Sequence, residues 1–131
     1  MDTSVSFKSE LFKPFLPDEL QVNPEVYGAE LAFWISKKLS SKGIVTSYPE
    51  SEDWGWYIEH FLGDNEYRLC CGNVEGSQTE WQCFLEPYAR GFFGRNKAPL
   101  ELTKPLLDAV RDILEETDGI NEIQWSRVGN T

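Results

Sequence analysis

The sequence predicts an α+β fold, in which an antiparallel sheet of four to five strands carries two helices packed on one face. Three observations support this prediction: a strand pattern with two tryptophans, a glycine turn that leads into a second strand, and two helical patterns, one before and one after these strands in the sequence. The length of 131 residues suits a single domain. We expect its core at 23–127, preceded by an N-terminal arm or edge strand at 1–22.

The tryptophan strand lies within 51–60, where apolar and polar residues alternate. Trp54, Trp56 and Ile58 occupy every second position, so they are expected on the same face of a strand. Two neighbouring indoles need a large core to cover them. We therefore expect this face to be the inner face of the sheet, under the helices.

The turn at Gly63–Asp64 predicts how the tryptophan strand pairs with the next strand. Glycine at the first central position fits a two-residue type II′ loop, which places Trp56 opposite Cys71 and Glu59 opposite Arg68. A short β-branched segment at 44–48 is expected to form a hairpin on the other side of the tryptophan strand.

Two further strands are expected at 80–86 and 120–125, each with alternating apolar residues. In the first of them, Trp81 is expected opposite Cys71. The inner face would then be continuous across the strands, with Trp56, Cys71 and Trp81 beneath the helices.

The helical patterns have recognisable ends. Asn23–Pro24 is typical of a helix start and Gly43 of a helix end, so a helix is predicted over 24–42. Leu106, Val110 and Ile113 lie on one face of a second helix, predicted over 101–117.

The composition narrows the functional classes. Twelve Lys and Arg against 22 Asp and Glu give a formal charge of -10, which opposes binding to nucleic acid or to an anionic membrane and suits a protein partner with a basic surface. The sequence starts without a secretory signal, and no apolar run has the length of a membrane span, so we expect a cytoplasmic protein. Nothing in the sequence predicts its oligomeric state.

Few residues suit catalysis or metal binding. Three cysteines, two of them adjacent, are expected to be free thiols without a metal. No phosphate-binding or nucleotide-binding motif is present, so no cofactor is expected. The single histidine, His60, is expected beside Tyr67; a hydrogen-bonded strand histidine is the favoured interpretation, and a small enzyme or ligand-binding domain with a pocket near these two residues is the alternative.

The stretch 88–97 contains no acidic residue and is the main candidate for an interaction site, because aromatic residues and arginine are enriched at interface centres. It could equally anchor itself on the core through its aromatic side chains. The acidic turn before Trp54 is a second candidate, although a solvated turn explains it as well. The candidate interaction residues are Tyr88, Arg90, Phe92, Phe93, Arg95 and Lys97 in the loop, with Glu52 and Asp53 in the turn.

The segments Glu52-Asp-Trp-Gly-Trp56, Trp81-Gln-Cys-Phe-Leu-Glu86 and Ile123-Gln-Trp125 resemble, over about 25–127, a family of small bacterial α+β proteins with an Asp-Trp-Gly-Trp strand. The resemblance implies the fold and a bacterial origin, and no activity. The size, acidity and layout are more loosely similar to toxin-immunity proteins. We therefore expect a non-enzymatic, protein-binding or immunity-type inhibitor module.

Overall fold

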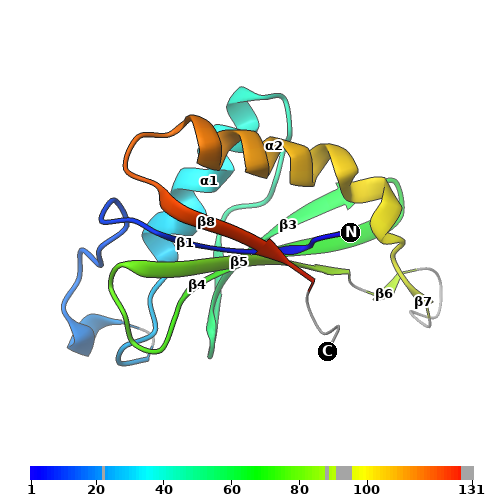
Figure 1. Ribbon diagram of the computed structural model, residues 1–131. Coiled ribbons are helices and arrows are strands. Elements are labelled where there is room, and N and C mark those ends of the chain that lie inside the picture. Colours follow the sequence, from blue (N-terminus) through cyan, green and yellow to red (C-terminus); the bar gives the residue numbers. More distant parts are fainter. Residues whose placement is uncertain (22, 88, 91–95, 128–131) are drawn as a thin grey trace.

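The computed structural model describes residues 1–21, 23–87, 89–90 and 96–127. Two helices, α1 (Ala29–Ser41) and α2 (Lys104–Glu116), lie on one face of a six-stranded antiparallel sheet (Figure 1). The α+β class with two helices is thereby confirmed. The sheet has one strand more than the four to five expected.

The strand order is β2-β3-β4-β5-β1-β8, so the four central segments of the chain form a meander that the two ends of the chain complete. A second, two-stranded sheet is made by β6 and β7. The strands are β1 (Ser4–Lys8), β2 (Glu50–Glu52), β3 (Gly55–Leu62), β4 (Asn65–Asn73), β5 (Glu80–Pro87), β6 (Ala89–Arg90), β7 (Asn96–Lys97) and β8 (Asn121–Ser126), and two short 3-10 helices are η1 (Asp18–Leu20) and η2 (Leu100–Thr103).

The segment 1–22 was predicted to form an arm or an edge strand, but its strand lies inside the sheet. Strand β1 lies between β5 and β8 and pairs with both. Its Val5 and Phe7 are only 1% and 2% exposed, because they point into the core beneath the helices. The last strand, β8, therefore takes the edge position.

The pairing of β3 with β4 is confirmed. Trp56 lies opposite Cys71 and Glu59 opposite Arg68. The turn between the strands has a positive φ of 62° at Gly63 and none at Asp64, as a type II′ turn requires. A two-residue turn leaves no freedom in the register, which is why the sequence alone predicted it.

The pairing of β4 with β5 differs from the prediction by two residues. Cys71 lies opposite Cys83, and Trp81 lies opposite Asn73. The turn between β4 and β5 lies further along the chain than expected. Hydrogen bonds from Val74 N to Glu80 O and from Ser77 N to Val74 O define it. A shift of two residues leaves each side chain on the same face, so Cys71 and Trp81 still belong to the core.

The predicted strand at 44–48 does not form. This segment instead contacts β3 through Ser47, whose backbone N–H donates to Glu59 O and whose hydroxyl oxygen accepts from Glu59 N, and through Val45 O, which is 3.0 Å from His60 Nδ1. The strand that pairs with β3 is β2, a few residues later.

The first helix begins five residues later than predicted, because the segment before it is held in another conformation. The side chain of Asn73 accepts a hydrogen bond from Tyr27 N at 2.9 Å and donates one to Glu25 O at 2.9 Å. Gly28, with φ of 144°, then turns the chain into α1. The second helix lies within its predicted bounds, preceded by η2.

Candidate functional site

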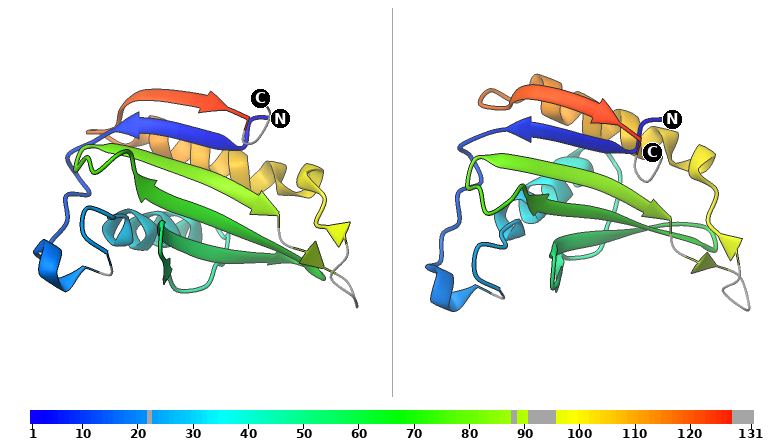
Figure 2. Two further views of the ribbon diagram at one scale, coloured as in Figure 1. Left: turned by 90° about the horizontal axis from the view of Figure 1, so that it is seen from below. Right: turned by 60° about the horizontal axis from the view of Figure 1, so that its bottom comes forward.

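Both helices lie on one face of the sheet, and we call the opposite face the outer face. Figure 2 shows it from below, with the strands in front and both helices behind them. The side chains that alternate onto it come from all six strands. They are Ser4, Ser6, Lys8, Glu50, Glu52, Tyr57, Glu59, Phe61, Glu66, Arg68, Cys70, Glu80, Gln82, Phe84, Glu86, Glu122, Gln124 and Ser126.

The outer face is strongly acidic. Seven of its residues are glutamates, and its only described cations are Lys8 and Arg68. The strand pairings bring these charges together from segments far apart in the sequence, so the sign of the face follows from the strand order. Each cation lies at its own end of the face.

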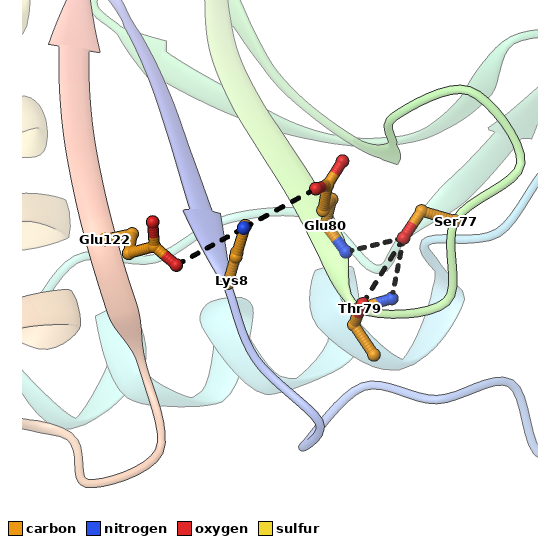
Figure 3. Close-up of polar contacts among 5 residues, drawn as sticks. All are labelled: Lys8, Ser77, Thr79, Glu80 and Glu122. Atoms are coloured by element: carbon orange, nitrogen blue, oxygen red, sulfur yellow. Dashed lines mark hydrogen bonds and ion pairs between the residues drawn. The ribbon is translucent and has the colours of Figure 1, made fainter.

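The Lys8 end consists of Lys8, Glu80 and Glu122, on three neighbouring strands (Figure 3). Lys8 Nζ is 3.8 Å from Glu80 Oε1 and 3.3 Å from Glu122 Oε2. An irregularity in the pairing of β1 with β8 accompanies a positive φ of 53° at Glu122. These side chains are about half exposed, so each ion pair contributes about 0–1 kcal/mol.

A hollow of about 220 Å³ lies at the Lys8 end: Lys8, Glu80 and Glu122 line it, together with neighbours that include Val74 and Gln124. Next to it, the Ser77 hydroxyl oxygen accepts hydrogen bonds from the backbone N–H groups of Thr79 and Glu80, both at 3.0 Å (Figure 3). These bonds fix the start of β5. The charged side chains that line the hollow are therefore already engaged with one another.

The Arg68 end consists of Glu50, Glu52, Tyr57, Glu59, Glu66, Arg68 and Glu86, on strands β2 to β5. The side chain of Arg68 is 18% exposed, and its nitrogens are 4.0 Å from both Glu52 and Glu66. Its guanidinium carbon lies 4.4 Å from the centre of the Tyr57 ring, which is cation–π geometry. The guanidinium therefore lies over the Tyr57 ring and is largely shielded from solvent.

The surroundings of Glu59 at the Arg68 end disfavour its ionised form. The pKa of Glu59 is raised, first by burial, then by its side-chain hydrogen bond to Glu66 and by the charges of Glu66 and Glu50, while Arg68 acts in the opposite direction. Two carboxyl groups form such a bond only when one of them keeps a proton. This pair therefore resists full ionisation.

Large aromatic side chains are also exposed on this side of the molecule. Phe61 is 52% exposed and Trp54 is 46% exposed. The prediction that Trp54 faces the core is wrong: its ring centre lies 5.8 Å from that of Phe84, on the outer face. The alternation breaks at Gly55, whose φ of 157° belongs to a conformation that other residues rarely adopt.

The residues predicted in the acidic turn have separate positions. Glu52 is part of the Arg68 end, 4.0 Å from Arg68. Asp53 lies in the turn before β3, where its backbone carbonyl accepts a hydrogen bond from the Asn23 side chain at 3.0 Å. Glu52 therefore belongs to the charged face, and the contact described at Asp53 is made by its backbone.

The predicted interaction loop falls mostly outside the described residues: Tyr88, Phe92, Phe93 and Arg95 are not among them. The backbone of Arg90 pairs with Asn96 and that of Lys97 with Ala89, so the described ends of the loop form the β6–β7 ribbon. The functional role of this loop remains a prediction.

The polar groups of His60 and Tyr67 both contact backbone carbonyls. His60 Nδ1 is 3.0 Å from Val45 O. The fully buried Tyr67 donates its hydroxyl hydrogen to Pro99 O, and burial, followed by the nearby Glu101, raises its pKa. A hollow of about 190 Å³ is lined by Val45 and its neighbours along the chain together with part of α1, but not by His60 or Tyr67.

The three cysteines are free and buried. Cys71 and Cys83 face each other with their sulfur atoms 3.7 Å apart; this contact and burial raise the pKa of Cys71, while burial is the main cause that raises that of Cys70. Thiols in such surroundings are poor nucleophiles. Within the described part of the chain, no group of three or more His, Cys, Asp or Glu side chains is placed to hold a metal ion.

The sequence interpretation missed Phe61, Glu66 and Glu86 as surface candidates. A usable signal was present, because Tyr57, Glu59 and Phe61 alternate on the face opposite Trp56 and Ile58.

No helix among the described residues has both the length and the apolar character needed to span a membrane. Searches of protein-family models, curated proteins and solved structures found no match to the chain.

Proposed function

We propose that the protein is a non-enzymatic binding module, of the immunity or inhibitor type, whose partner is a protein with a basic surface. The observation that carries the proposal is the acidic outer face, with seven glutamates and two described cations. Complementary charge across an interface speeds association and selects the partner. The same charge opposes nucleic acids, which leaves a basic protein as the ligand with matching chemistry.

The contacts of the outer face also favour binding over catalysis. Both cations are engaged with carboxylates, and the strands hold the charges on a rigid framework. A rigid, charged and partly aromatic face loses little conformational entropy on binding. Exposed Trp54 and Phe61 add apolar area of the kind found at interface centres.

The proposal is tested with the tagged protein as bait in an extract of its source cells. We expect a stoichiometric partner of high isoelectric point, released at high salt and inhibited in its own activity when the purified protein is added. A captured partner with an acidic surface, or one that is unaffected in activity, would contradict the inhibitor proposal.

The 88–97 loop offers a second way to bind the same kind of partner. Replacing Arg90, Arg95 and Lys97 together by Ala should weaken capture, with little change in the thermal midpoint, if the loop forms the interface centre. Normal capture by this variant would assign binding to the outer face. Unfolding of the variant would assign the loop the role of an anchor.

The alternative function is that of a small enzyme or ligand-binding domain with a pocket near His60 and Tyr67, and it leads to a different expectation. A His60→Gln variant would then lose small-molecule turnover or binding while keeping its fold. The bonds from these two side chains to Val45 O and Pro99 O favour a structural role for both, so we expect this variant to capture the partner as well as the wild type does.

A further inference from the structure

The two edges of the six-stranded sheet differ in how well they are protected. Among the described residues, β2 and β8 each pair with one strand only. Strand β2 has three residues, and two of them are exposed glutamates; short and charged edge strands resist pairing with a further strand. Strand β8, drawn in red in Figure 2, has six residues with a single charge, Glu122, and neither proline nor lysine. The β8 edge is therefore the one that can accept another strand.

The hydrogen bonds at the two ends of β1 show which way its backbone groups point. Ser9 N donates to Thr79 O at 2.9 Å, and Leu85 N donates to Thr3 O at 2.8 Å. Both bonds join an odd-numbered position of the β1 segment to the β5 segment. Because this direction alternates from one residue of a strand to the next, the even-numbered residues of β1 direct their backbone groups to β8.

The pairing of β1 with β8 extends this alternation to the edge of the sheet. Ser6, an even-numbered residue, lies opposite Gln124, so Gln124 directs its backbone groups to β1. Ile123 and Trp125, on either side of it, direct their N–H and C=O groups away from β1. The edge thus offers two donors and two acceptors to an incoming strand.

Two copies of β8 fit each other in an antiparallel register. A twofold axis at Gln124 places Ile123 of each copy opposite Trp125 of the other, so that each of these two pairs forms two backbone hydrogen bonds. Both side chains lie on the core side of the strand and are partly exposed, and as cross-strand neighbours they would cover each other. Glu122 would lie opposite Ser126, and not opposite a second acid.

A row of charges on α2 matches the same twofold axis. Lys104, Asp108, Arg111 and Glu115 follow one another at spacings of about three to four residues, which places them on one side of the helix. The guanidinium carbon of Arg111 lies 4.4 Å from the centre of the Trp125 ring, so this side borders β8. The charges alternate in sign. Reversed by the axis, Lys104 would face Glu115 of the second copy, and Asp108 would face its Arg111.

The acidity of the chain does not prevent this contact. The formal charge of -10 opposes association in general. However, six of the seven outer-face glutamates lie on β2 to β5, and β1 separates these strands from β8. Salt screens exposed charges that are more than about 8 Å apart. An extended segment of another protein could use the same backbone groups, but only a second copy brings the complementary α2 row.

We propose that the β8 edge is a self-association surface, through which two copies form a twofold dimer with one continuous sheet and with their α2 rows paired. The axis is perpendicular to the sheet, so both outer faces lie on the same side of the dimer and stay uncovered. The inference goes beyond the proposed function and does not depend on it.

The α2 row is tested by sedimentation equilibrium of the full chain between about 10 µM and about 1 mM. Lys104→Glu and Glu115→Lys each place like charges opposite one another, so each should weaken self-association about fivefold or more. Glu115→Lys is the sharper variant, because it makes the chain less acidic and should otherwise favour association. An equimolar mixture of the two variants restores opposite charges and should associate within about twofold of the wild type.

The matched control is Asp112→Lys, which changes the charge of α2 by the same amount outside the row and should alter self-association by no more than about twofold. The thermal midpoint of each variant should stay near that of the wild type, since the side chains of Lys104, Glu115 and Asp112 are exposed. This measurement separates lost association from lost folding.

The strand contact is tested by amide hydrogen exchange, followed by NMR at the two ends of the concentration range. We expect the exchange of the Ile123 and Trp125 amides to slow down at high concentration, and that of the β2 amides to stay unchanged. A monomer at every concentration, protection at β2 in place of β8, or undiminished self-association of Glu115→Lys would overturn the proposal. So would a monomer whose β8 amides are protected only by a protein from the source cells, because an extended segment of that protein would then be the occupant.

Discussion

Asn73→Ala should destabilise the protein by about 2–3 kcal/mol, because one side chain makes three hydrogen bonds to the backbone. Its oxygen accepts from Tyr27 N at 2.9 Å, and its nitrogen donates to Glu25 O at 2.9 Å and to Ser77 O at 3.1 Å. Each bond contributes about 0.5–1.5 kcal/mol net, and the partly buried groups left without a partner add to the loss. The side chain ties the entry into α1 and the turn after β4 to the sheet.

Urea unfolding followed by tryptophan fluorescence measures this loss. Asn73→Asp is the informative companion variant: it keeps an acceptor for Tyr27 N but places a carboxylate oxygen against the two carbonyls, so we expect a loss at least as large. Exposed Asn121→Ala is the matched control and should change the free energy of unfolding by less than about 0.5 kcal/mol. A loss below about 1 kcal/mol in Asn73→Ala, or a stable Asn73→Asp, would refute this account of the side chain.

The other predictions concern the core, the carboxyl pair and the thiols. Trp81→Ala should cost about 3–5 kcal/mol in urea unfolding, since Trp81 is fully buried and donates to Ser9 O at 3.0 Å; the half-buried Trp56→Ala should cost less, and an equal or larger loss would show that Trp56 is the main core residue. The pKa of Glu59 is raised above its ordinary value of 4.5. Protonated Glu59 therefore contributes its full stabilisation at pH values below 4.5, and this contribution is lost as the pH rises through the raised pKa. Glu59→Gln should therefore have a higher thermal midpoint than the wild type at neutral pH and no advantage below about pH 4.5, whereas exposed Glu115→Gln should have no advantage at either pH; a lower midpoint for Glu59→Gln at neutral pH would contradict the cause given for the shift. The three buried thiols should react slowly with a thiol reagent in the native protein and all react after denaturation, and fast reaction of native Cys70 would show that the outer face is open above it.

Local patterns predicted those parts of the fold that local physics determines. The two-residue turn at Gly63–Asp64 fixed the pairing of β3 with β4, and the periodicity of Leu106, Val110 and Ile113 located α2. Features that depend on distant partners were beyond the same reasoning. Nothing near Val5 and Phe7 indicates that β1 is inserted between β5 and β8, since that position is set by the partners on either side.

The candidate site shows the same division. Alternation along β3 assigns Glu59 and Phe61 to one face, so the residues of the outer face could be identified strand by strand from the sequence. Their gathering into one acidic end could not, because it requires β2, β3, β4 and β5 to be neighbours in that order. Glu59 and Glu66 likewise occupy diagonal positions on two neighbouring strands, and this is visible only once the register is known.

Gly55 connects the Asp-Trp-Gly-Trp segment to the outer face. A Cβ atom at this position would lie 2.8 Å from Cys71 O, closer than Cβ atoms approach a backbone oxygen, and at Gly28 it would lie 2.7 Å from the same oxygen. The chain on each side of β4 can therefore come this close only with glycine. At Gly55 the same conformation interrupts the alternation, so that Trp56 turns toward the helices and Trp54 turns toward Phe84. The glycine thus divides the two tryptophans on either side of it between the core and the face that we propose binds the partner, which gives the segment a structural and a functional reason for its spacing.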